Sequence, residues 1–259
     1  MSRKLFQLKS FFNYWLDAVD EHSLHSPFLF QFYTRVVKQK TTADEWQHLR
    51  QTLSHDNRII KVTDLGAGSV RMNKSDRKVS DVFRFTTSLH RFSSLYARII
   101  HHFHFRNVIE LGTSVGVNAM YMAKASNEVK LATFEGSPEI ARIARTMFSD
   151  NAIENIALIE GNIDATLEPY LETIDQLDFA LIDANHRFEP TVRYLELMLR
   201  KVHAHSIIAI DDIHNSHEME RAWRSIQKHH LVYTTIDLYR CGLVFFNPSL
   251  TRQNVVLQF

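Results

Sequence analysis

From about residue 107 onward, short apolar segments alternate with segments of helical spacing, and this regularity constrains the fold more than any other feature. Pro138 suits the first turn of one of the expected helices. Buried strands that alternate with helices predict a parallel sheet covered on both faces, and therefore an α/β fold. The expected strands lie at 108–111, 129–134, 156–159, 177–182 and 206–210, and the clearest helices between them at 117–125, 138–148 and 191–201.

The chain changes character toward its carboxyl end. Strands expected at 231–238 and 243–246 are joined by a few residues that include Gly242, which predicts an antiparallel hairpin. Dehydrogenase-type nucleotide-binding folds normally stay parallel throughout, so this hairpin argues against them. Residues 1–88 are expected to be mainly helical and to form a cap, substrate or dimer region, while residues 89–259 form the sheet domain.

Composition and charge describe an ordinary globular chain. Hydrophobic residues make up 45% and charged residues 23%, so a core can form without disulfides or metal ions. The net charge of +1 gives no broad electrostatic reason to expect nucleic acid or a membrane as partner. No segment approaches the roughly 20 apolar residues that cross a bilayer. Because Cys241 is the single cysteine, a reducing compartment and hence a cytoplasmic location are predicted.

Two turns in the sequence combine an acidic residue with glycines, at 64–68 and at 110–116. A cofactor loop needs a strand before it, a helix after it, and an acid at the end of the next strand to bind ribose hydroxyls. The first turn is followed by a polar, basic stretch without helical spacing. The second is followed by a helix and then by a strand that ends at Glu135. We therefore expect the cofactor loop at 110–116, and a structural turn or part of the substrate mouth at 64–68.

Three segments carry a family resemblance. Residues 108–123 and 133–138 resemble the first two motifs of class I S-adenosylmethionine-dependent methyltransferases, and residues 178–186 resemble the fourth-strand motif of small-molecule O-methyltransferases. Over roughly residues 89–246 the chain is most similar to the cation-dependent catechol and caffeoyl-coenzyme A type.

The resemblance implies a Rossmann-like, seven-stranded sheet in the order 3-2-1-4-5-7-6, with the last strand antiparallel and a helical N-terminal extension. It also implies S-adenosylmethionine as cofactor and methylation of a hydroxyl on a small molecule. Independently of the resemblance, aromatic residues in the first forty could line an acceptor pocket, belong to the core as their helical spacing suggests, or form a homodimer contact. The cofactor-binding residues implied are Glu110, Gly112, Ser114 and Gly116 at the methionine part, Glu135 at the ribose, Asn162 and Ile163 at the adenine, and Thr113, Gly136 and Asp183 as further contacts.

Acidic residues follow the fourth and fifth strands, namely Asp183 and the pair Asp211 and Asp212. Adjacent strands lie about 4.8 Å apart, so the three carboxylates could share one ligand. Clustered carboxylates suit an oxygen-coordinated divalent cation such as Mg²⁺, Mn²⁺ or Ca²⁺, which in the related enzymes lowers the pKa of the acceptor hydroxyl. Alternatively, Asp183 contacts cofactor or substrate while Asp211 and Asp212 cap the next helix.

Two histidines stand beside these acids, His186 and His214. An imidazole titrates near neutrality, so either residue is a candidate general base. The sequence therefore predicts Asp183, His186 and His214 as catalytic residues.

A different chemistry fits part of the same pattern. Residues 112–116 match the Gly-x-Ser-x-Gly elbow of α/β-hydrolases, with Ser114, Asp183 and His214 in the matching chain order. Against this hypothesis, such an elbow normally follows several strands, no oxyanion loop of the His-Gly-Gly kind is present, and Glu135 would have no role. A non-catalytic S-adenosylmethionine-binding protein is the other alternative.

Overall fold

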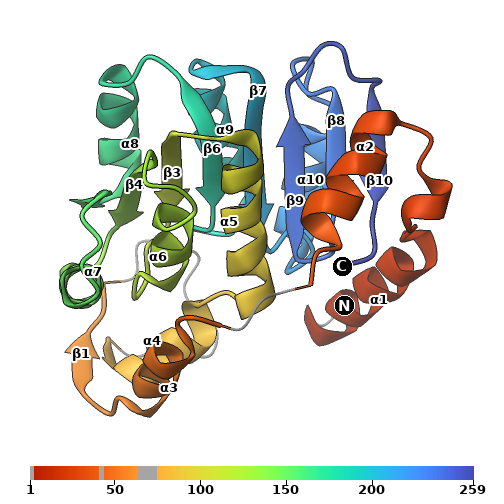
Figure 1. Ribbon diagram of the computed structural model, residues 1–259. Helices are drawn as coiled ribbons and strands as arrows, with labels where there is room; N and C mark the ends of the chain where they lie inside the picture. Colours follow the sequence, from red (N-terminus) through yellow and green to blue (C-terminus); the bar gives the residue numbers. More distant parts are fainter. Residues whose placement is uncertain (1–2, 41–43, 64–74) are drawn as a thin grey trace. The chain divides into compact units, whose positions relative to one another are not determined.

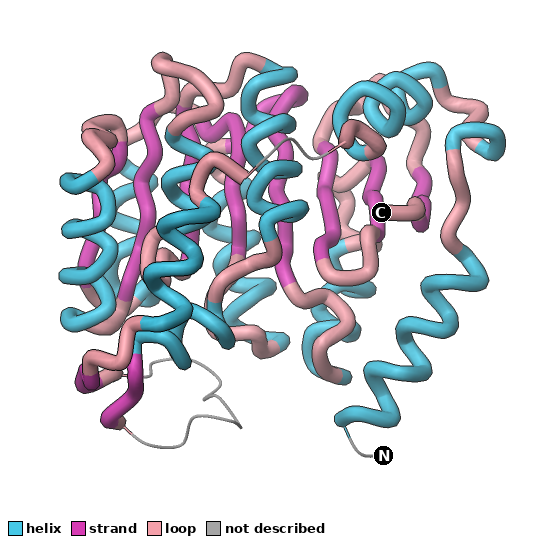
Figure 2. Tube along the Cα trace, turned by 60° about the horizontal axis from the view of Figure 1, so that its bottom comes forward, coloured by secondary structure: helices cyan, strands magenta, loops and turns pink. Residues whose placement is uncertain are grey.

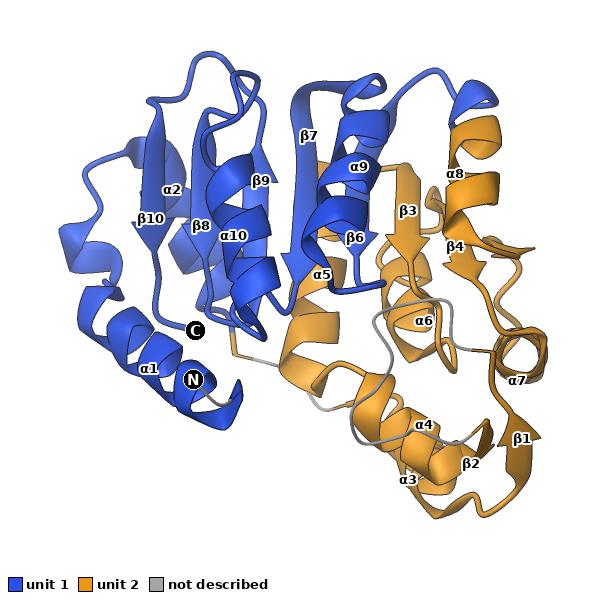
Figure 3. Ribbon diagram, turned by 180° about the vertical axis from the view of Figure 1, so that it is seen from behind, with its two compact units in different colours: residues 1–39, 171–259 blue, residues 40–170 orange. Residues whose placement is uncertain are grey.

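The computed structural model describes residues 3–40, 44–63 and 75–259. Its backbone alternates helices and strands from residue 90 onward, as the sequence predicts (Figures 1 and 2). The chain divides into two compact units, which we call unit 1 (residues 1–39 and 171–259) and unit 2 (residues 40–170) (Figure 3). The predicted boundary at residue 88 is a different division and stays a prediction.

Unit 2 contains the first three strands of the expected parallel sheet. They lie in the order β3 (Asn107–Leu111), β4 (Lys130–Glu135) and β5 (Ile156–Glu160), each parallel to its neighbour. This order corresponds to the 3-2-1 half of the predicted sheet. The helices around these strands are α5 (His90–Phe103), α6 (Val117–Ala123), α7 (Pro138–Asp150) and α8 (Ile163–Glu172), the last of which runs into unit 1.

The earlier part of unit 2 packs against the loop between β3 and α6. It consists of α3 (Gln47–His55), β1 (Ile59–Lys61), β2 (Asp76–Lys78) and α4 (Val79–Thr86), with β1 and β2 antiparallel. Its apolar side chains share one core cluster with Val115 of the loop and Ile140 of α7. The glycine turn at 64–68 lies outside the described residues.

Unit 1 contains the second half of the predicted sheet, in the order β6 (Leu177–Ile182), β7 (Val202–Asp211), β9 (Cys241–Phe245) and β8 (Thr234–Asp237). Strands β6 and β7 are parallel, and β9 is antiparallel to both β7 and β8. The predicted order 4-5-7-6 and the antiparallel hairpin are thus confirmed. A further strand, β10 (Gln253–Val256), lies parallel to β8 and was not predicted.

Helices cover both faces of the strands of unit 1. α9 (Phe188–Leu199) and α10 (His217–Ile226) lie on one face, and α2 (Pro27–Phe32) lies on the other (Figures 1 and 3). The ring of Phe245 lies 5.4 Å from those of Phe28 and Phe32, which fixes α2 against β9. The remaining N-terminal helices are α1 (Arg3–Asp17), the 3₁₀ turn η1 (Glu21–Ser23) and the π-helical turn η2 (Tyr33–Val37). Among the described helices, none combines the length and the apolar character that a bilayer crossing requires.

Candidate active site

The loop between β3 and α6, where the cofactor loop is predicted, contains several residues with positive φ. Gly112 and Gly116 have φ values of 98° and 88°, and Ser114 between them has a φ of 50°. A Cβ placed on Gly116 would lie 2.7 Å from Cε1 of Phe148, so this position needs glycine for space as well as for conformation. The loop therefore brings its main chain close to whatever lies over the amino end of α6.

Glu135, at the end of β4, holds this loop in place. Its Oε2 accepts a 2.9 Å hydrogen bond from the backbone N–H of Ser114, and its Oε1 accepts one of 2.9 Å from the N–H of Ser137. The carboxylate thus joins the loop after β3 to the loop after β4. Each carboxylate oxygen can accept a second hydrogen bond, so these contacts leave capacity for ribose hydroxyls.

Glu110, at the end of β3, is fully buried. The hydroxyl of Thr133 donates a 2.5 Å hydrogen bond to Oε2, while Oε1 has no hydrogen-bond partner among the described residues. Burial raises the pKa of Glu110 from 4.5 to about 8; the bond from Thr133 opposes this shift and the charge of Glu135 adds to it. Thr113 belongs to the same network, because its hydroxyl lies 2.6 Å from that of Thr133.

The residues expected at the adenine lie after β5. Asn162 is exposed and its Oδ1 accepts a 3.1 Å hydrogen bond from the N–H of Asp164, so it caps α8. Ile163 and Gly136 are half-buried. All the predicted cofactor residues except Asp183 therefore belong to unit 2.

Unit 1 carries the predicted acids and histidines. Nε2 of His186 lies 3.5 Å from Oδ1 of Asp183 in the loop after β6. Asn185 and His186 both have left-handed backbone conformations, with φ values of 65° and 46°, and Oδ1 of Asn185 is buried without a described hydrogen-bond partner. Strained non-glycine backbone of this kind is concentrated at functional loops, so the loop after β6 is a candidate acceptor site.

Asp211 and Asp212, at the end of β7, both form ion pairs with Arg240. Arg240, in the β8–β9 hairpin, lies 3.4 Å from Oδ2 of Asp211 through Nη2 and 3.4 Å from Oδ1 of Asp212 through Nε. Burial raises the pKa of Asp211, and the charge of Asp212 raises it further, while Arg240 and His186 lower it. In the part of the chain that the structure describes, no three ligating side chains are grouped to hold a metal ion.

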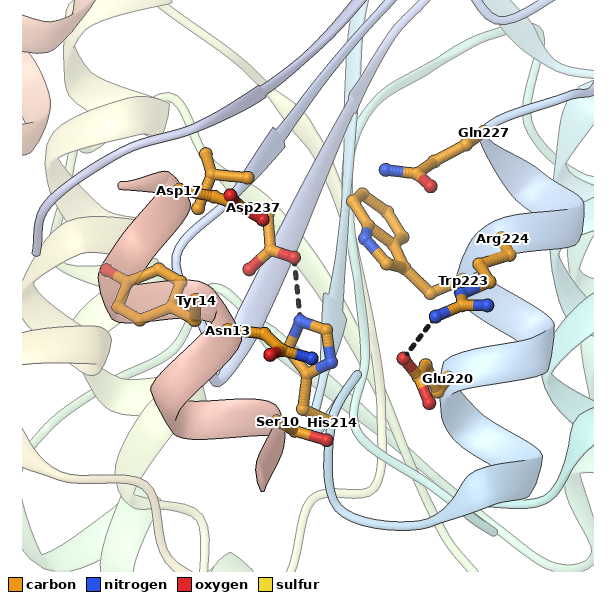
Figure 4. A pocket seen from close by; sticks show the side chains of 11 residues that line it. Ser10, Asn13, Tyr14, Asp17, His214, Glu220, Trp223, Arg224, Gln227 and Asp237 are labelled. Carbon is orange, nitrogen blue, oxygen red and sulfur yellow. Dashed lines mark hydrogen bonds and ion pairs between the residues drawn. The ribbon is translucent and has the colours of Figure 1, made fainter. Parts of the chain in front are cut away.

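His214 lines a pocket of about 190 Å³ within unit 1 (Figure 4). Its Nε2 is 2.7 Å from Oδ2 of Asp237, the last residue of β8. Its Nδ1, and Nε1 of Trp223 on α10, are buried without a described hydrogen-bond partner. The pocket is lined by Ser10, Asn13, Tyr14, Asp17, His214, Glu220, Trp223, Arg224, Gln227, Asp237 and Val256.

The hydroxyl of Ser114 is not hydrogen-bonded to a base that could activate it as a nucleophile. It is hydrogen-bonded to the hydroxyl of Thr86, which cannot act as a base. His214, the histidine assigned to the hydrolase alternative, is bonded to Asp237 rather than to Asp183. The local contacts therefore give no support to a serine hydrolase.

Sequence reasoning missed Arg240 and Asp237. Both come from the hairpin that the sequence predicted, but it was interpreted only as a sheet element. A basic residue at the tip of that hairpin was the available signal for Arg240.

Most of the predicted site residues lie within a match to a known protein family. Residues 109–213 match a family model described as a methyltransferase domain. The match spans the glycine loop and both acid-bearing loops of unit 1. A search of curated protein sequences finds no match.

Solved structures share the fold. An O-methyltransferase from Bacillus cereus in complex with S-adenosylhomocysteine has a TM-score of 0.58 at 16% identity, over 84% of this chain and 97% of that one. The O-methyltransferase TomG from Streptomyces achromogenes, in complex with S-adenosylmethionine, has a TM-score of 0.54 at 14% identity, over 62% and 82%. A methyltransferase from Podospora anserina bound to S-adenosylhomocysteine has a TM-score of 0.55 at 15% identity, over 62% and 80%. Residues 109–213 therefore resemble a methyltransferase domain, and the chain shares its fold with these methyltransferases.

Proposed function

We propose that this protein is an S-adenosylmethionine-dependent methyltransferase, which transfers the methyl group of that cofactor to a hydroxyl of a small molecule. The observation that carries the proposal is the Glu135 network, in which one carboxylate holds the loops after β3 and β4 by two 2.9 Å bonds. An acid at this place is what ribose binding beside a glycine loop requires. Structures with the same fold that are named O-methyltransferases support oxygen as the methyl acceptor.

Unit 2 offers the groups that bind the cofactor in this proposal. Bound S-adenosylmethionine would supply an electrophilic methyl group on a sulfonium sulfur. Glu135 would accept hydrogen bonds from the ribose hydroxyls, and the buried Oε1 of Glu110 would accept one from the amino group of the methionine part. The loop residues 112–116 and Gly136 would line the same site, with Asn162 and Ile163 at the adenine.

Unit 1 offers a base for the acceptor. When the acceptor oxygen bonds to the methyl carbon, the bond from sulfur to that carbon breaks and the hydroxyl proton must leave. His186 would take this proton: an Nε2–H directed at Asp183 leaves the lone pair of Nδ1 to receive it. Asp183 would then stabilise the imidazolium, and the buried Oδ1 of Asn185 would accept a hydrogen bond from the acceptor molecule.

The divalent cation that the sequence suggested has no part in this proposal. Arg240 already supplies a positive charge 3.4 Å from both Asp211 and Asp212. Asp211 is also fully buried, so a guanidinium is a better match for it than a hydrated Mg²⁺, which keeps several of its waters. We therefore assign Asp211 and Asp212 to holding the β8–β9 hairpin through Arg240.

Calorimetry with S-adenosylhomocysteine tests the cofactor half of the proposal. The wild type should bind it, and Glu135→Ala should weaken binding by about ten-fold or more, because hydrogen bonds to a charged group are lost. Glu160→Ala is the matched control, since Glu160 ends β5 and pairs with Arg145 on the surface. Equal affinity for the wild type and Glu135→Ala would contradict the assignment.

Transfer of a labelled methyl group to a panel of catechol and phenol acceptors tests the other half. Ser114→Ala should keep most of this activity, whereas a hydrolase would lose ester cleavage outright with the same substitution. Binding of S-adenosylhomocysteine without transfer to any acceptor would point instead to a non-catalytic binding protein.

A further inference from the structure

Helix α1 packs against the rest of unit 1 with one face and exposes an apolar face on the opposite side. On the inner face, Phe6 is buried and its ring lies 3.9 Å from that of His217 on α10. On the outer face, Leu5 is 55% exposed, and four further large apolar side chains are exposed to solvent: Leu8 by 66%, Phe12 by 57%, Trp15 by 63% and Leu16 by 59%. Soluble proteins rarely leave so many large apolar side chains exposed together, so the outer face requires a partner.

The arrangement of these side chains describes the partner's shape. At about 100° per residue, the four lie within an arc of about 100° on the helix surface. The rings of Phe12 and Trp15 stack with centroids 6.1 Å apart within this arc. Lys4 and Lys9 are exposed and lie about 20° beyond its two edges. An apolar stripe bordered by lysines on both sides is the pattern of a helix that lies in a membrane interface.

We propose that this outer face of α1, defined by Leu8, Phe12, Trp15 and Leu16 with Lys4 and Lys9, binds the surface of an anionic lipid bilayer. The helix would lie in the plane of the interface. Its 15 residues extend about 22 Å, less than the roughly 30 Å of a hydrocarbon core. The apolar side chains enter the boundary between headgroups and acyl chains, and the lysine stems reach back to the phosphates.

Charge distinguishes a lipid surface from a second copy of the chain. Asp17 is the only acidic residue of α1, and it lies on the inner side, where it lines the His214 pocket (Figure 4). Two outer faces packed together would bring Lys4 and Lys9 of both copies to one seam, and the outer face of α1 carries no carboxylate that could pair with them. Anionic headgroups provide the missing countercharge, at a contribution of about five-fold in binding for each lysine.

Co-sedimentation of the full chain with vesicles tests the proposal. The wild type should sediment with vesicles of phosphatidylcholine that contain one quarter phosphatidylserine, and only weakly with phosphatidylcholine alone. Lys4→Gln with Lys9→Gln should lower the partition coefficient by about 25-fold and reduce its salt dependence. Phe12→Ser with Trp15→Ser should abolish sedimentation. Ile59→Ser is the matched control, because Ile59 is 69% exposed but belongs to no basic helix.

Circular dichroism checks the folding of each variant. The fold should be kept, because the substituted side chains are exposed. Binding also moves Trp15 into the interface, so vesicles should shift the tryptophan emission of the wild type to the blue, and a Trp15→Ser variant should lack that change. Three results would each overturn the proposal: no sedimentation with anionic vesicles at low salt, equal sedimentation with neutral vesicles, or unchanged binding by the Phe12→Ser/Trp15→Ser variant. A dimer in sedimentation velocity that this variant dissociates, without vesicle binding by the wild type, would assign the face to a second copy.

Discussion

Glu110 carries a stability cost that depends on pH. Burial raises its pKa from 4.5 to about 8, so between these values the folded state keeps a proton that the unfolded state has lost. The unfolded state therefore binds fewer protons, and the free energy of unfolding falls as pH rises through this window. At about 1.4 kcal/mol per pH unit the whole decrease is on the order of 5 kcal/mol, and it is complete above pH 8.

Glu110→Gln should remove this dependence, because the carboxamide has no charge to bury and its oxygen can still accept the bond from Thr133. The variant should be more stable than the wild type at pH 8.5, with a much smaller difference at pH 5.5. Urea unfolding of both proteins without cofactor measures this, with Glu160→Gln as the surface control. A difference in stability that is the same at both pH values would refute the assignment of the shift to Glu110.

Replacing Arg240 should lower the stability of the folded protein. Arg240→Gln leaves the carboxylate of Asp211 buried without its counter-charge, which should destabilise the protein by about 3 kcal/mol. Asp211→Asn in the same background should recover part of that loss, because the charge is then gone. Thermal unfolding of the two single variants and the double variant gives the coupling. If Mg²⁺ raised the midpoint of the wild type and a chelator lowered it, these acids would be metal ligands instead.

Among the secondary-structure elements, the strands that contain an apolar run in the sequence were predicted correctly. Each predicted strand from 108–111 to 243–246 forms, and this includes β5, whose apolar run is only partly buried. Strands β2 and β10 were not predicted, since β2 is entirely charged (Asp76–Lys78) and the first half of β10 is polar (Gln253–Val256), so neither contains an apolar run. The local pattern also predicted a strand that ends at Glu135 after the helix that follows the glycines, and β4 ends at this residue.

The missed features are those that depend on long-range contacts. Arg240 with Asp211, and His214 with Asp237, join residues 29 and 23 positions apart, and no spacing rule relates them. The outer face of α1 was missed for a related reason. Its apolar periodicity predicts a buried face, and only the packing of Phe6 shows that the opposite face is the covered one. The net charge of +1 is an average over the whole chain, so it did not indicate that two lysines border that face.

The loop between β3 and α6 should require glycine at position 116. Gly116→Ala places a Cβ 2.7 Å from Phe148 and forces a φ of 88° on a non-glycine residue. The conformational part alone should cost about 1 to 2 kcal/mol of stability. Phe148→Leu in the same background should relieve the steric part only. Urea unfolding and calorimetry with S-adenosylhomocysteine measure the two effects, and full affinity in Gly116→Ala would show that the loop does not need this backbone.

At the level of the whole molecule, the proposed site residues are divided between the two units. The glycine loop, Glu110 and Glu135 belong to unit 2, whereas the His186–Asp183 pair belongs to unit 1. Removing the proposed base should therefore affect transfer without affecting cofactor binding. Such a separation distinguishes a proton acceptor from a residue that supports the fold of the cofactor loop.

His186→Gln should lower the turnover number for a hydroxyl acceptor by about 10² to 10⁴, the usual contribution of general base catalysis. Its dissociation constant for S-adenosylhomocysteine should stay within about two-fold of the wild type. His203→Gln is the matched control, because His203 is also paired with an aspartate of unit 1, lying 2.9 Å from Asp178, but at the opposite, amino-terminal ends of β6 and β7. Turnover that survives in His186→Gln, or is lost equally in both variants, would contradict His186 as the base. Restored turnover of His186→Gln at high pH, where the acceptor ionises unaided, would support it, because a residue needed only for structure gives no such recovery.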